Sequence, residues 1–405
     1  MSKKTIKDHL IGQVPEDILN KINRSFEIVG DIAIIEILDD DVAVYEELIA
    51  EKVMLMNPRV NVVLKKFGIH HGEFRTQKLE HVKGPNRKET EYIENGIRLK
   101  INPETVYFSS KLSTERQDLM ENLKENKRVL VMFSGAGPYT FVALKKQPNL
   151  SRIDSIEINP NGHMYAIENL KLNKNLIKKS NLFKETIQKL KENNLPIIEK
   201  KIISNLNKLK VHFFNYDVKD AIENIKLDEY NYEFEFFDNE IFETADKVIF
   251  ESLKNKEEEI LYINLDKIRF DKLKHFLILF ADEFDFICQI EDKTFLFDSD
   301  YKKGLLLNIL ESYDHNKVDK YDEIFMPLPK DAYDFLDCAF KFADNRCIIH
   351  MYDFVHENDF PHETENKVLA AAASHNCEIK IIQTRKVGQY SPRKYRVCCD
   401  FILIS

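Results

Sequence analysis

The sequence predicts an α/β protein with a Rossmann-like sheet of about seven strands, preceded by a small α+β module and interrupted by an acidic insertion. Three observations lead to this prediction. Strand-like apolar runs alternate with helical segments over residues 111–217 and again over 322–405. Residues 218–321 lose this alternation and are rich in acidic side chains. Residues 1–110 contain shorter apolar runs separated by glycines.

The first 110 residues predict the small α+β module. Residues 26–38 have two β-branched runs around Gly30-Asp31, which is typical of a β-hairpin. A helix is expected over 40–55 and a strand over 59–66. The polar segment 68–102, with its glycines, is typical of short strands joined by turns.

The regular alternation begins near residue 113, where Ser113 or Thr114 is expected to cap a helix running to Lys124. Residues 128–133 then form a continuous apolar run of the buried parallel-strand type. The elements expected next are a helix at 139–146, a strand at 153–158, a helix at 163–174 and a strand at 211–216. This order requires a parallel sheet with helices on its faces.

The alternation resumes after the acidic segment and closes the sheet. The expected elements are a strand at 324–326, a helix at 331–342, a strand at 347–352, a helix at 363–374 and an antiparallel pair at 378–384 and 395–403. With the three earlier strands this makes about seven, the insertion being left out.

Charge is distributed unevenly along the chain. Formal net charge is −9, but residues 220–320 hold 13 basic and 26 acidic side chains, a net of −13, so the remainder is −9 + 13 = +4. Residues 57–130 hold 15 basic and 10 acidic side chains, a net of +5. The basic part can meet an anionic partner, whereas the acidic block would repel phosphate. We expect the block to dock a protein partner or to be structural.

The six cysteines lie in the C-terminal third without a C-x2-C pair, which favours reduced thiols over a disulfide framework or a metal site. No apolar run reaches the roughly 18 residues of a membrane span. No signal peptide is evident either. We therefore expect no metal and no membrane association, and a location in the cytoplasm or the nucleus.

Side chains at the ends of the first three strands predict a nucleotide-type cofactor. Gly135 and Gly137 follow the strand at 128–133, the first of the parallel sheet, and let the backbone approach a ligand. An ordinary tight turn would use these glycines as well. Glu157 follows the second strand, where a carboxylate can bind both ribose hydroxyls, and Asp217 follows the third, near an adenine amino group. The loop lacks a third glycine at dinucleotide spacing and has no Gly-Lys-Ser/Thr, which favours S-adenosylmethionine.

The chain resembles the tRNA (guanine-37 N1)-methyltransferases of archaea and eukaryotes over roughly residues 15–217 and 322–405. The matching runs are Gly72-Glu73-Phe74-Arg75, Leu79-Glu80-His81, Glu94-Asn95-Gly96-Ile97-Arg98, Val106-Tyr107-Phe108, Leu112-Ser113-Thr114-Glu115-Arg116, Met132-Phe133-Ser134-Gly135-Ala136-Gly137-Pro138, Ile156-Glu157-Ile158-Asn159-Pro160, Glu168-Asn169-Leu170-Lys171-Leu172-Asn173, Tyr390-Ser391-Pro392 and Asp400-Phe401.

The resemblance implies a class I methyltransferase fold and methyl transfer from S-adenosylmethionine to N1 of the guanine 3′ to the anticodon. By match to the family's motifs, Glu115 is the general base, Arg75 binds guanine O6 and Tyr107 packs beside the target base. The residues alone also allow ordinary structural roles: Glu115 at a helix N-terminus, Arg75 as a solvated arginine and Tyr107 as a core residue.

The resemblance also assigns cofactor positions and a partner. The implied cofactor residues are Arg116, Gly135, Gly137, Glu157, Ile158, Asp217, Val218 and Pro327. The implied partner is the anticodon stem-loop of tRNA, positioned by the module 1–110, while 111–217 and 322–405 form the catalytic domain. We expect a monomer. Two departures stand out: Pro327 replaces the Asn of the family's Asn-Leu-Pro signature, and Val131 replaces an acid.

Two other functions stay open at this point. One is the related aminocarboxypropyl transferase of the wybutosine pathway, which shares the cofactor; the Leu-Ser-Thr-Glu-Arg run argues against it. The other is a tRNA-binding homologue without activity, which Pro327 motivates.

Overall fold

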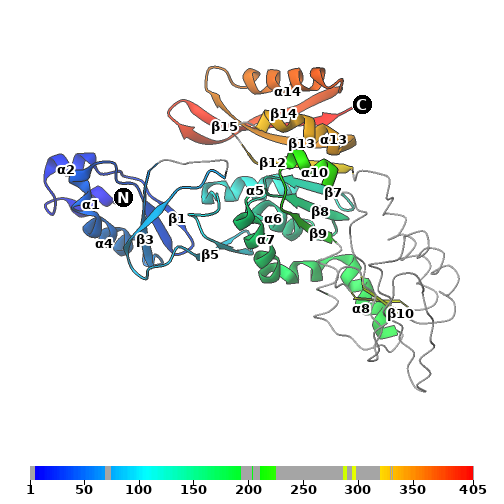
Figure 1. Ribbon diagram of the computed structural model, residues 1–405, viewed down its shortest axis with the longest axis horizontal. Helices are drawn as coiled ribbons and strands as arrows, with labels where there is room; N and C mark the ends of the chain where they lie inside the picture. Colours follow the sequence, from blue (N-terminus) through cyan, green and yellow to red (C-terminus); the bar gives the residue numbers. More distant parts are fainter. Residues whose placement is uncertain are drawn as a thin grey trace.

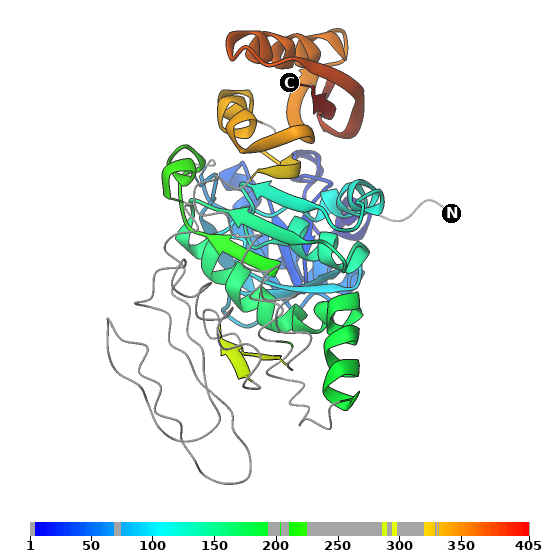
Figure 2. The ribbon, with the colours of Figure 1, turned by 90° about the vertical axis from the view of Figure 1, so that its right-hand side faces the viewer.

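The computed structural model describes residues 5–68, 74–192, 203, 210–224, 286–289, 294–297, 320–328, 330 and 332–404. Within these ranges an N-terminal module lies beside a large twisted sheet, blue next to cyan, green and orange in Figure 1. The view turned by 90° shows the helices above and below this sheet (Figure 2). None of the described helices is long and apolar enough to cross a bilayer.

The N-terminal module is a four-stranded sheet with helices on one face. Its elements are α1 (Ile6–Leu10), α2 (Glu16–Lys21), β1 (Glu27–Val29), β2 (Ile32–Ile35), α3 (Asp40–Ala43), α4 (Glu46–Met56), β3 (Val62–Lys66) and β4 (Leu79–Lys83), with strand order β1-β2-β3-β4. The predicted hairpin is confirmed, with Gly30 at a φ of 58° in its turn. The single helix expected over 40–55 is divided into α3 and α4.

A two-stranded hairpin connects the module to the rest of the chain. Its strands, β5 (Thr90–Glu94) and β6 (Ile97–Ile101), lead to the turn η1 (Ser110–Leu112) and helix α5 (Ser113–Glu121). The predicted cap is wrong, because Ser113 is already helical and the preceding residue is Leu112. The 3-10 turn continues directly into α5, so no side-chain cap is formed.

Among the described residues the large sheet has seven strands, in the order β14-β15-β13-β12-β7-β8-β9, which confirms the predicted number. These are β7 (Arg128–Met132), β8 (Arg152–Ile156), β9 (Val211–Phe214), β12 (Tyr321–Met326), β13 (Ala343–His356), β14 (Ile379–Ser391) and β15 (Lys394–Leu403). The five consecutive strands β13, β12, β7, β8 and β9 are parallel to one another. Strand β15 pairs antiparallel with β13 and β14, as expected for a closing pair.

Helices cover both faces of this sheet, so its central strands are apolar on both sides. The helices are α5, α6 (Pro138–Lys146), α7 (Pro160–Asn173), η2 (Lys174–Lys179), α10 (Val218–Asn224), η4 (Ala332–Phe335), α13 (Leu336–Phe342) and α14 (His362–Ser374), while α8 (Asn181–Glu192) packs against η2. Leu130 and Met132 of β7 join the core under α10 and α13. Val129 and Val131 join the opposite core with α5 and α6. Val131, where the family usually has an acid, is therefore a fully buried core residue.

The acidic insertion is shorter at both ends than predicted. Val218 and Ala221 of α10 are buried in the core of the α/β domain, and Tyr321 already belongs to β12. Inside the insertion, β10 (Phe286–Gln289) and β11 (Thr294–Phe297) form an antiparallel pair. The rest of the predicted insertion lies outside the described residues, so its docking role stays a prediction.

Candidate active site

The strand order reverses between β7 and β12, which is where a ligand crevice is expected in an open α/β sheet. From β7 the chain proceeds through β8 to β9 on one side, whereas β12 lies on the other side of β7. In open α/β sheets, ligands bind outside the carboxyl ends of the strands where the order reverses in this way. The loops after β7, β8, β9 and β12 meet at that edge, and they carry most of the predicted cofactor residues.

The loop after β7 has an unusual backbone. Phe133, Gly135 and Gly137 all have positive φ, at 57°, 57° and 83°. Phe133 is strained there, because residues with a Cβ rarely adopt this conformation. A Cβ on Gly137 would lie 2.8 Å from a ring carbon of Phe141, so both conformation and space require glycine. Ser134 Oγ is buried here without a hydrogen-bond partner among the described residues, as is expected of a group that awaits a ligand.

Glu157 connects the loops after β7 and β8. Its carboxylate accepts hydrogen bonds from the N–H of Gly135 at 2.6 Å and from the N–H of Asn159 at 2.8 Å. Burial raises the pKa of Glu157, and these backbone donors oppose the rise only in part. The carbonyl of the following residue, Ile158, accepts from Asn215 Nδ2 at 3.1 Å. Glu157 is thus fixed against the glycine loop, at the place where a ribose-binding carboxylate is expected.

The remaining predicted cofactor positions lie on both sides of the crevice. Asp217 follows β9 and accepts from the N–H of Lys219 at 2.9 Å, which caps α10. Val218 points into the core, so only its backbone can face a ligand. Pro327 follows β12, and the next residue, Leu328, donates its N–H to Met326 O at 2.8 Å. Proline offers only its carbonyl to a ligand at this position.

Arg75 and Tyr107 line one cavity of about 250 Å³. Its walls come from the module's sheet, from residues 103–112 and from the β14–β15 hairpin, and they include Lys66, Phe108, Lys111, Tyr390 and Arg396. Arg75 Nη2 donates to the carbonyl of Lys330 at 2.5 Å, close to the loop after β12. A Cβ on Gly135 would lie 3.5 Å from Tyr107 O. The cavity and the glycine loop are therefore neighbours.

Glu115 lies in the first turn of α5 but is not among the residues lining this cavity. Its Oε1 accepts hydrogen bonds from Tyr352 Oη at 2.8 Å and from Arg385 Nη2 at 2.7 Å. The side chain is 10% exposed. Leu112, one turn earlier, does line the cavity, so Glu115 is close to its wall. The structure thus brings Arg75 and Tyr107 together in one cavity, and Glu115 lies one helical turn after Leu112 of its wall.

The structure does not support the predicted cofactor contact of Arg116. Its side chain is 1% exposed and forms a bidentate ion pair with Glu94, at 2.6 and 2.5 Å. The guanidinium also donates to Ser109 O and lies 5.2 Å from the ring centroid of Phe108. Arg116 instead joins α5 to the β5–β6 hairpin, because a buried arginine needs a carboxylate partner.

Comparison with known families adds to this geometry. Residues 90–261 match a family described as the TRM5/TYW2 methyltransferase domain, and residues 6–87 match the TYW2 N-terminal domain. This part of the chain is therefore similar to the TRM5/TYW2 methyltransferase domain. The predicted resemblance is thereby confirmed.

Two curated relatives of the TRM5/TYW2 domain differ in how much they cover. The tRNA (guanine(37)-N(1))-methyltransferase Trm5b of Pyrococcus abyssi is 38% identical over 164 residues, 40% of this chain and 48% of that protein. The match therefore spans about half of that relative's length. Taw22 of Nanoarchaeum equitans, a tRNA (guanine(37)-N(1))/4-demethylwyosine(37)-methyltransferase, is 27% identical over 381 residues, 94% of this chain and 100% of that protein.

A solved structure supports the same fold. The complex of aTrm5 with tRNALeu aligns with a TM-score of 0.58 and 21% identity, over 100% of this chain and 79% of that one. At this identity the likeness concerns the fold, and the predicted class I methyltransferase fold is confirmed.

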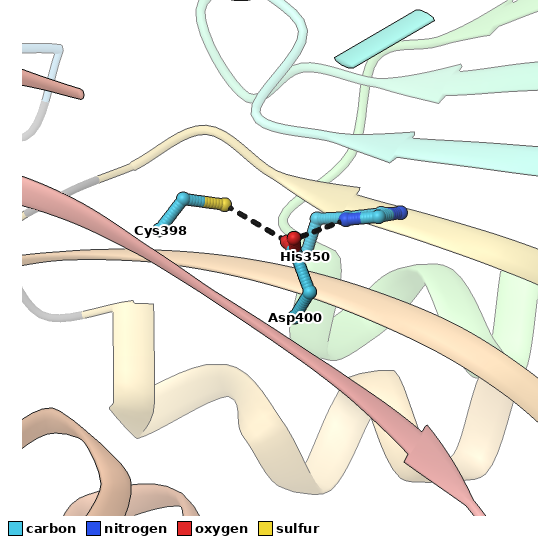
Figure 3. A group of neighbouring side chains, drawn as sticks. All are labelled: His350, Cys398 and Asp400. Carbon is cyan, nitrogen blue, oxygen red and sulfur yellow. Dashed lines mark hydrogen bonds and ion pairs between the residues drawn. The ribbon is translucent and has the colours of Figure 1, made fainter. Parts of the chain in front are cut away.

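Sequence reasoning missed the groups that hold Glu115 in the TRM5/TYW2 domain. Arg385 also pairs with Asp400, and Asp400 accepts from His350 Nδ1 at 2.7 Å and Cys398 Sγ at 3.2 Å (Figure 3). Burial lowers the pKa of His350, but its hydrogen bonds to Asp400 and Glu323 outweigh this and raise it to about 9. Asp400 belongs to a matched family run, but no local signal connects Arg385 with a residue 270 positions earlier.

His350, Cys398 and Asp400 also resemble a set of metal ligands, since their ligand atoms lie within 4.8 Å of one another. The separation of 2.7 Å between His350 Nδ1 and Asp400 Oδ1 is that of a hydrogen bond. Ligand atoms around a tetrahedral zinc ion are roughly 3.3 Å or more apart, given bonds of about 2.0 Å. The geometry therefore indicates a hydrogen-bonded cluster.

Proposed function

We propose that this protein transfers a methyl group from S-adenosylmethionine to N1 of guanine 37 in tRNA. The observation that carries the proposal is the meeting of three parts at one edge of the sheet. These are the glycine loop after β7, the cavity lined by Arg75 and Tyr107, and the anchored carboxylate of Glu115. The TRM5/TYW2 domain and the relatives that are named for this reaction support it.

The residues at the crevice fit S-adenosylmethionine. When bound, S-adenosylmethionine supplies an electrophilic methyl group on sulfur. The backbone of Gly135 and Gly137 would let it approach the sheet, and Glu157 would hold its ribose hydroxyls. Asp217 and the backbone of Val218 would hold the adenine, and the carbonyl of Pro327 would be available on the other side. Ser134 Oγ, which has no partner among the described residues, is an additional donor for it.

Guanine N1 carries a proton on the Watson–Crick edge, so the base must leave its stack before reaction. Glu115 takes that proton as the new N1–methyl bond forms. Arg75 donates to O6, where negative charge develops as N1 loses its proton. Tyr107, whose side chain is 42% exposed in the cavity, supplies an aromatic surface beside the base.

The rim of the cavity suits an anticodon loop. Lys66, Lys111 and Arg396 contribute positive charge, and Phe108 and Tyr390 contribute aromatic rings. Cations that meet phosphates and rings that stack on bases are the usual means of binding single-stranded RNA. The aTrm5 complex with tRNALeu supports this choice of partner. We further propose a monomer, in keeping with the sequence-based expectation.

The decisive experiment is methyl transfer to an unmodified tRNA transcript with guanine at position 37, followed by nucleoside mass spectrometry. We expect 1-methylguanosine, and none from the same transcript with adenosine at position 37. Absence of product with both transcripts, under conditions where tRNA binds, would refute the proposal and favour a tRNA-binding protein without activity. Calorimetry with S-adenosylmethionine distinguishes these cases, since only the enzyme must bind it.

A second candidate is supported by the match to the TYW2 N-terminal domain. Transfer of the aminocarboxypropyl group from the same cofactor would add a much heavier group than methyl. The same mass spectra decide between the two. Taw22 suggests a further acceptor, 4-demethylwyosine at the same tRNA position, to be offered as a competing substrate.

A further inference from the structure

The carboxylate of Glu115 is held at one oxygen. Tyr352 Oη and Arg385 Nη2 both donate to Oε1, at 2.8 and 2.7 Å. Tyr352 comes from β13 and Arg385 from β14, so two strands fix a residue of helix α5. A carboxylate has two oxygens, and neither of these bonds uses Oε2. Oε2 is therefore the atom that can meet the proton of a substrate.

Arg385 is shared between two carboxylates. Its Nη2 reaches Glu115 and its Nη1 reaches Asp400 Oδ2. Asp400 is buried and also accepts from Gln383 Nε2 at 2.7 Å and His350 Nδ1 at 2.7 Å. Four donors, with the thiol of Cys398 as the fourth, fix the Asp400 carboxylate. The guanidinium of Arg385 is thereby held in one plane and at one distance from Glu115.

The chain of contacts continues to the centre of the sheet. His350 Nε2 is 3.0 Å from Glu323 Oε1 on β12, and its ring stacks on Phe325 with centroids 4.6 Å apart. With His350 protonated, the cluster has two positive groups, His350 and Arg385. Its three negative groups are the carboxylates of Asp400, Glu323 and Glu115. The formal charge is +2 − 3 = −1, and it becomes 0 when Glu115 accepts a proton.

We propose that Arg385 and Asp400 are positioning residues for the proposed methyl transfer: Arg385 aims the carboxylate of Glu115, and Asp400 balances the charge of Arg385 and holds its guanidinium in place. This inference rests on the proposed function, in which Glu115 takes the N1 proton. An arginine alone would stabilise the ionised carboxylate and weaken the base. The carboxylate of Asp400 offsets that effect and leaves the orientation intact.

The pH profile gives a signature that a purely structural role would not. The groups that interact with Glu115 are Arg385 of β14, Tyr352 of β13, Tyr139 of α6 and Cys398 of β15, and Asp400 is connected to it through Arg385. In Asp400→Asn the positive charge of Arg385 is no longer balanced, so we expect the acidic limb of the rate profile to move to lower pH. In Arg385→Met the cation is lost and the limb moves up.

The experiment measures single-turnover methyl transfer to the guanine-37 transcript between pH 5 and 9. For Asp400→Asn and Arg385→Met we expect rates at pH 7.5 about 10- to 100-fold below wild type, with opposite shifts of the acidic limb. Affinities for tRNA and S-adenosylmethionine should stay within about twofold, because neither residue is placed in contact with them. Arg385→Lys should restore only part of the rate lost in Arg385→Met, since Lys cannot bridge both carboxylates in a fixed plane.

The matched control is Asp154→Asn, because Asp154 is also a buried aspartate bound by an arginine and a histidine. It should alter stability without shifting the pH profile of the folded enzyme. The inference is overturned if Asp400→Asn and Arg385→Met leave the profile unchanged, or shift it in the same direction. Should either variant fail to fold, Arg385→Lys still decides: a wild-type rate and profile would overturn the inference. Failure of the wild type to methylate guanine 37 would instead reject the proposed function.

Discussion

Two buried aspartates in the large sheet have similar partners but different surroundings. Asp154 binds Arg152 Nε at 2.8 Å, His212 Nδ1 at 2.7 Å and Tyr321 Oη at 2.5 Å. Asp400 binds His350, Gln383, Cys398 and Arg385. The partners of Asp154 come from strands of the sheet, β8, β9 and β12, whereas Arg385 also reaches Glu115 on helix α5.

This difference shows how one arrangement of charges can serve two purposes. Burial raises the pKa of Asp154, but Arg152 and His212 outweigh it and leave the pKa below its ordinary value. The pKa of Asp400 is also lowered despite burial, by His350 and Arg385. Both aspartates therefore stay ionised in the sheet. Only the Asp400 cluster extends to a residue that the proposed reaction uses.

The largest expected effect is at Glu115, which Arg385 connects to the Asp400 cluster. Glu115→Gln keeps the size of the side chain but cannot accept the N1 proton, so we expect methyl transfer to fall about 10²- to 10⁴-fold. Single-turnover rates with saturating tRNA measure it. Glu121→Gln is the control on the same helix, since Glu121 pairs with Lys146 at the surface. Normal turnover by Glu115→Gln would remove Glu115 from its proposed role.

The next largest effect concerns the cluster around Asp154. Asp154→Asn leaves Arg152 and His212 buried without their anion, so we expect the free energy of unfolding to fall by about 3–5 kcal/mol. Urea titration followed by circular dichroism measures this loss. The rate per folded molecule should remain within about twofold of wild type. A large loss of rate in the folded fraction would show that the two clusters do not differ as described.

The pH dependence of stability sharpens the comparison. The pKa of His350 is raised from 6.5 to about 9 on folding. A raised folded-state pKa stabilises below pH 6.5, and the stabilisation is lost as pH rises through about 9. The shift corresponds to roughly 3 kcal/mol. Urea titrations of wild type and His350→Gln between pH 6 and 9.5 should converge with rising pH; a constant difference would contradict the assignment.

The smallest effects come from removing one hydroxyl at each cluster. Tyr321→Phe removes the bond to Asp154, and Tyr352→Phe removes the bond to Glu115. We expect each to lower the free energy of unfolding by about 1–2 kcal/mol. Only Tyr352→Phe should also slow methyl transfer. We expect a loss of about a few-fold in rate, which corresponds to the free energy of one hydrogen bond. Equal kinetic effects of the two substitutions would remove the distinction.

The sequence predicted what depends on neighbouring residues. The strand at 128–133, the turn at Gly30 and the glycine loop at Gly135 and Gly137 follow from local composition, and the structure contains all of them. The cap at Ser113 was wrong because the preceding 3-10 turn, η1, changes where the helix starts.

Features that depend on distant pairing could not be predicted. Arg116 follows Glu115 in a family run, but its direction is decided by Glu94, which is 22 residues earlier and buried with it. The contact between Arg385 and Glu115 needs two strands and a helix to meet, and nothing in either segment encodes the distance.

Strand β12 is where the chain re-enters the sheet after the acidic segment, and two of its side chains determine its alignment. Tyr321 binds Asp154 and Glu323 binds His350, so a slip of one residue would turn both polar groups away from their partners. Arg128 N–H adds a third constraint by donating to Asp322. A long connection costs little more entropy than a moderate one. The length of the segment before β12 therefore matters little for the pairing of this strand, because its alignment is specified within the strand itself.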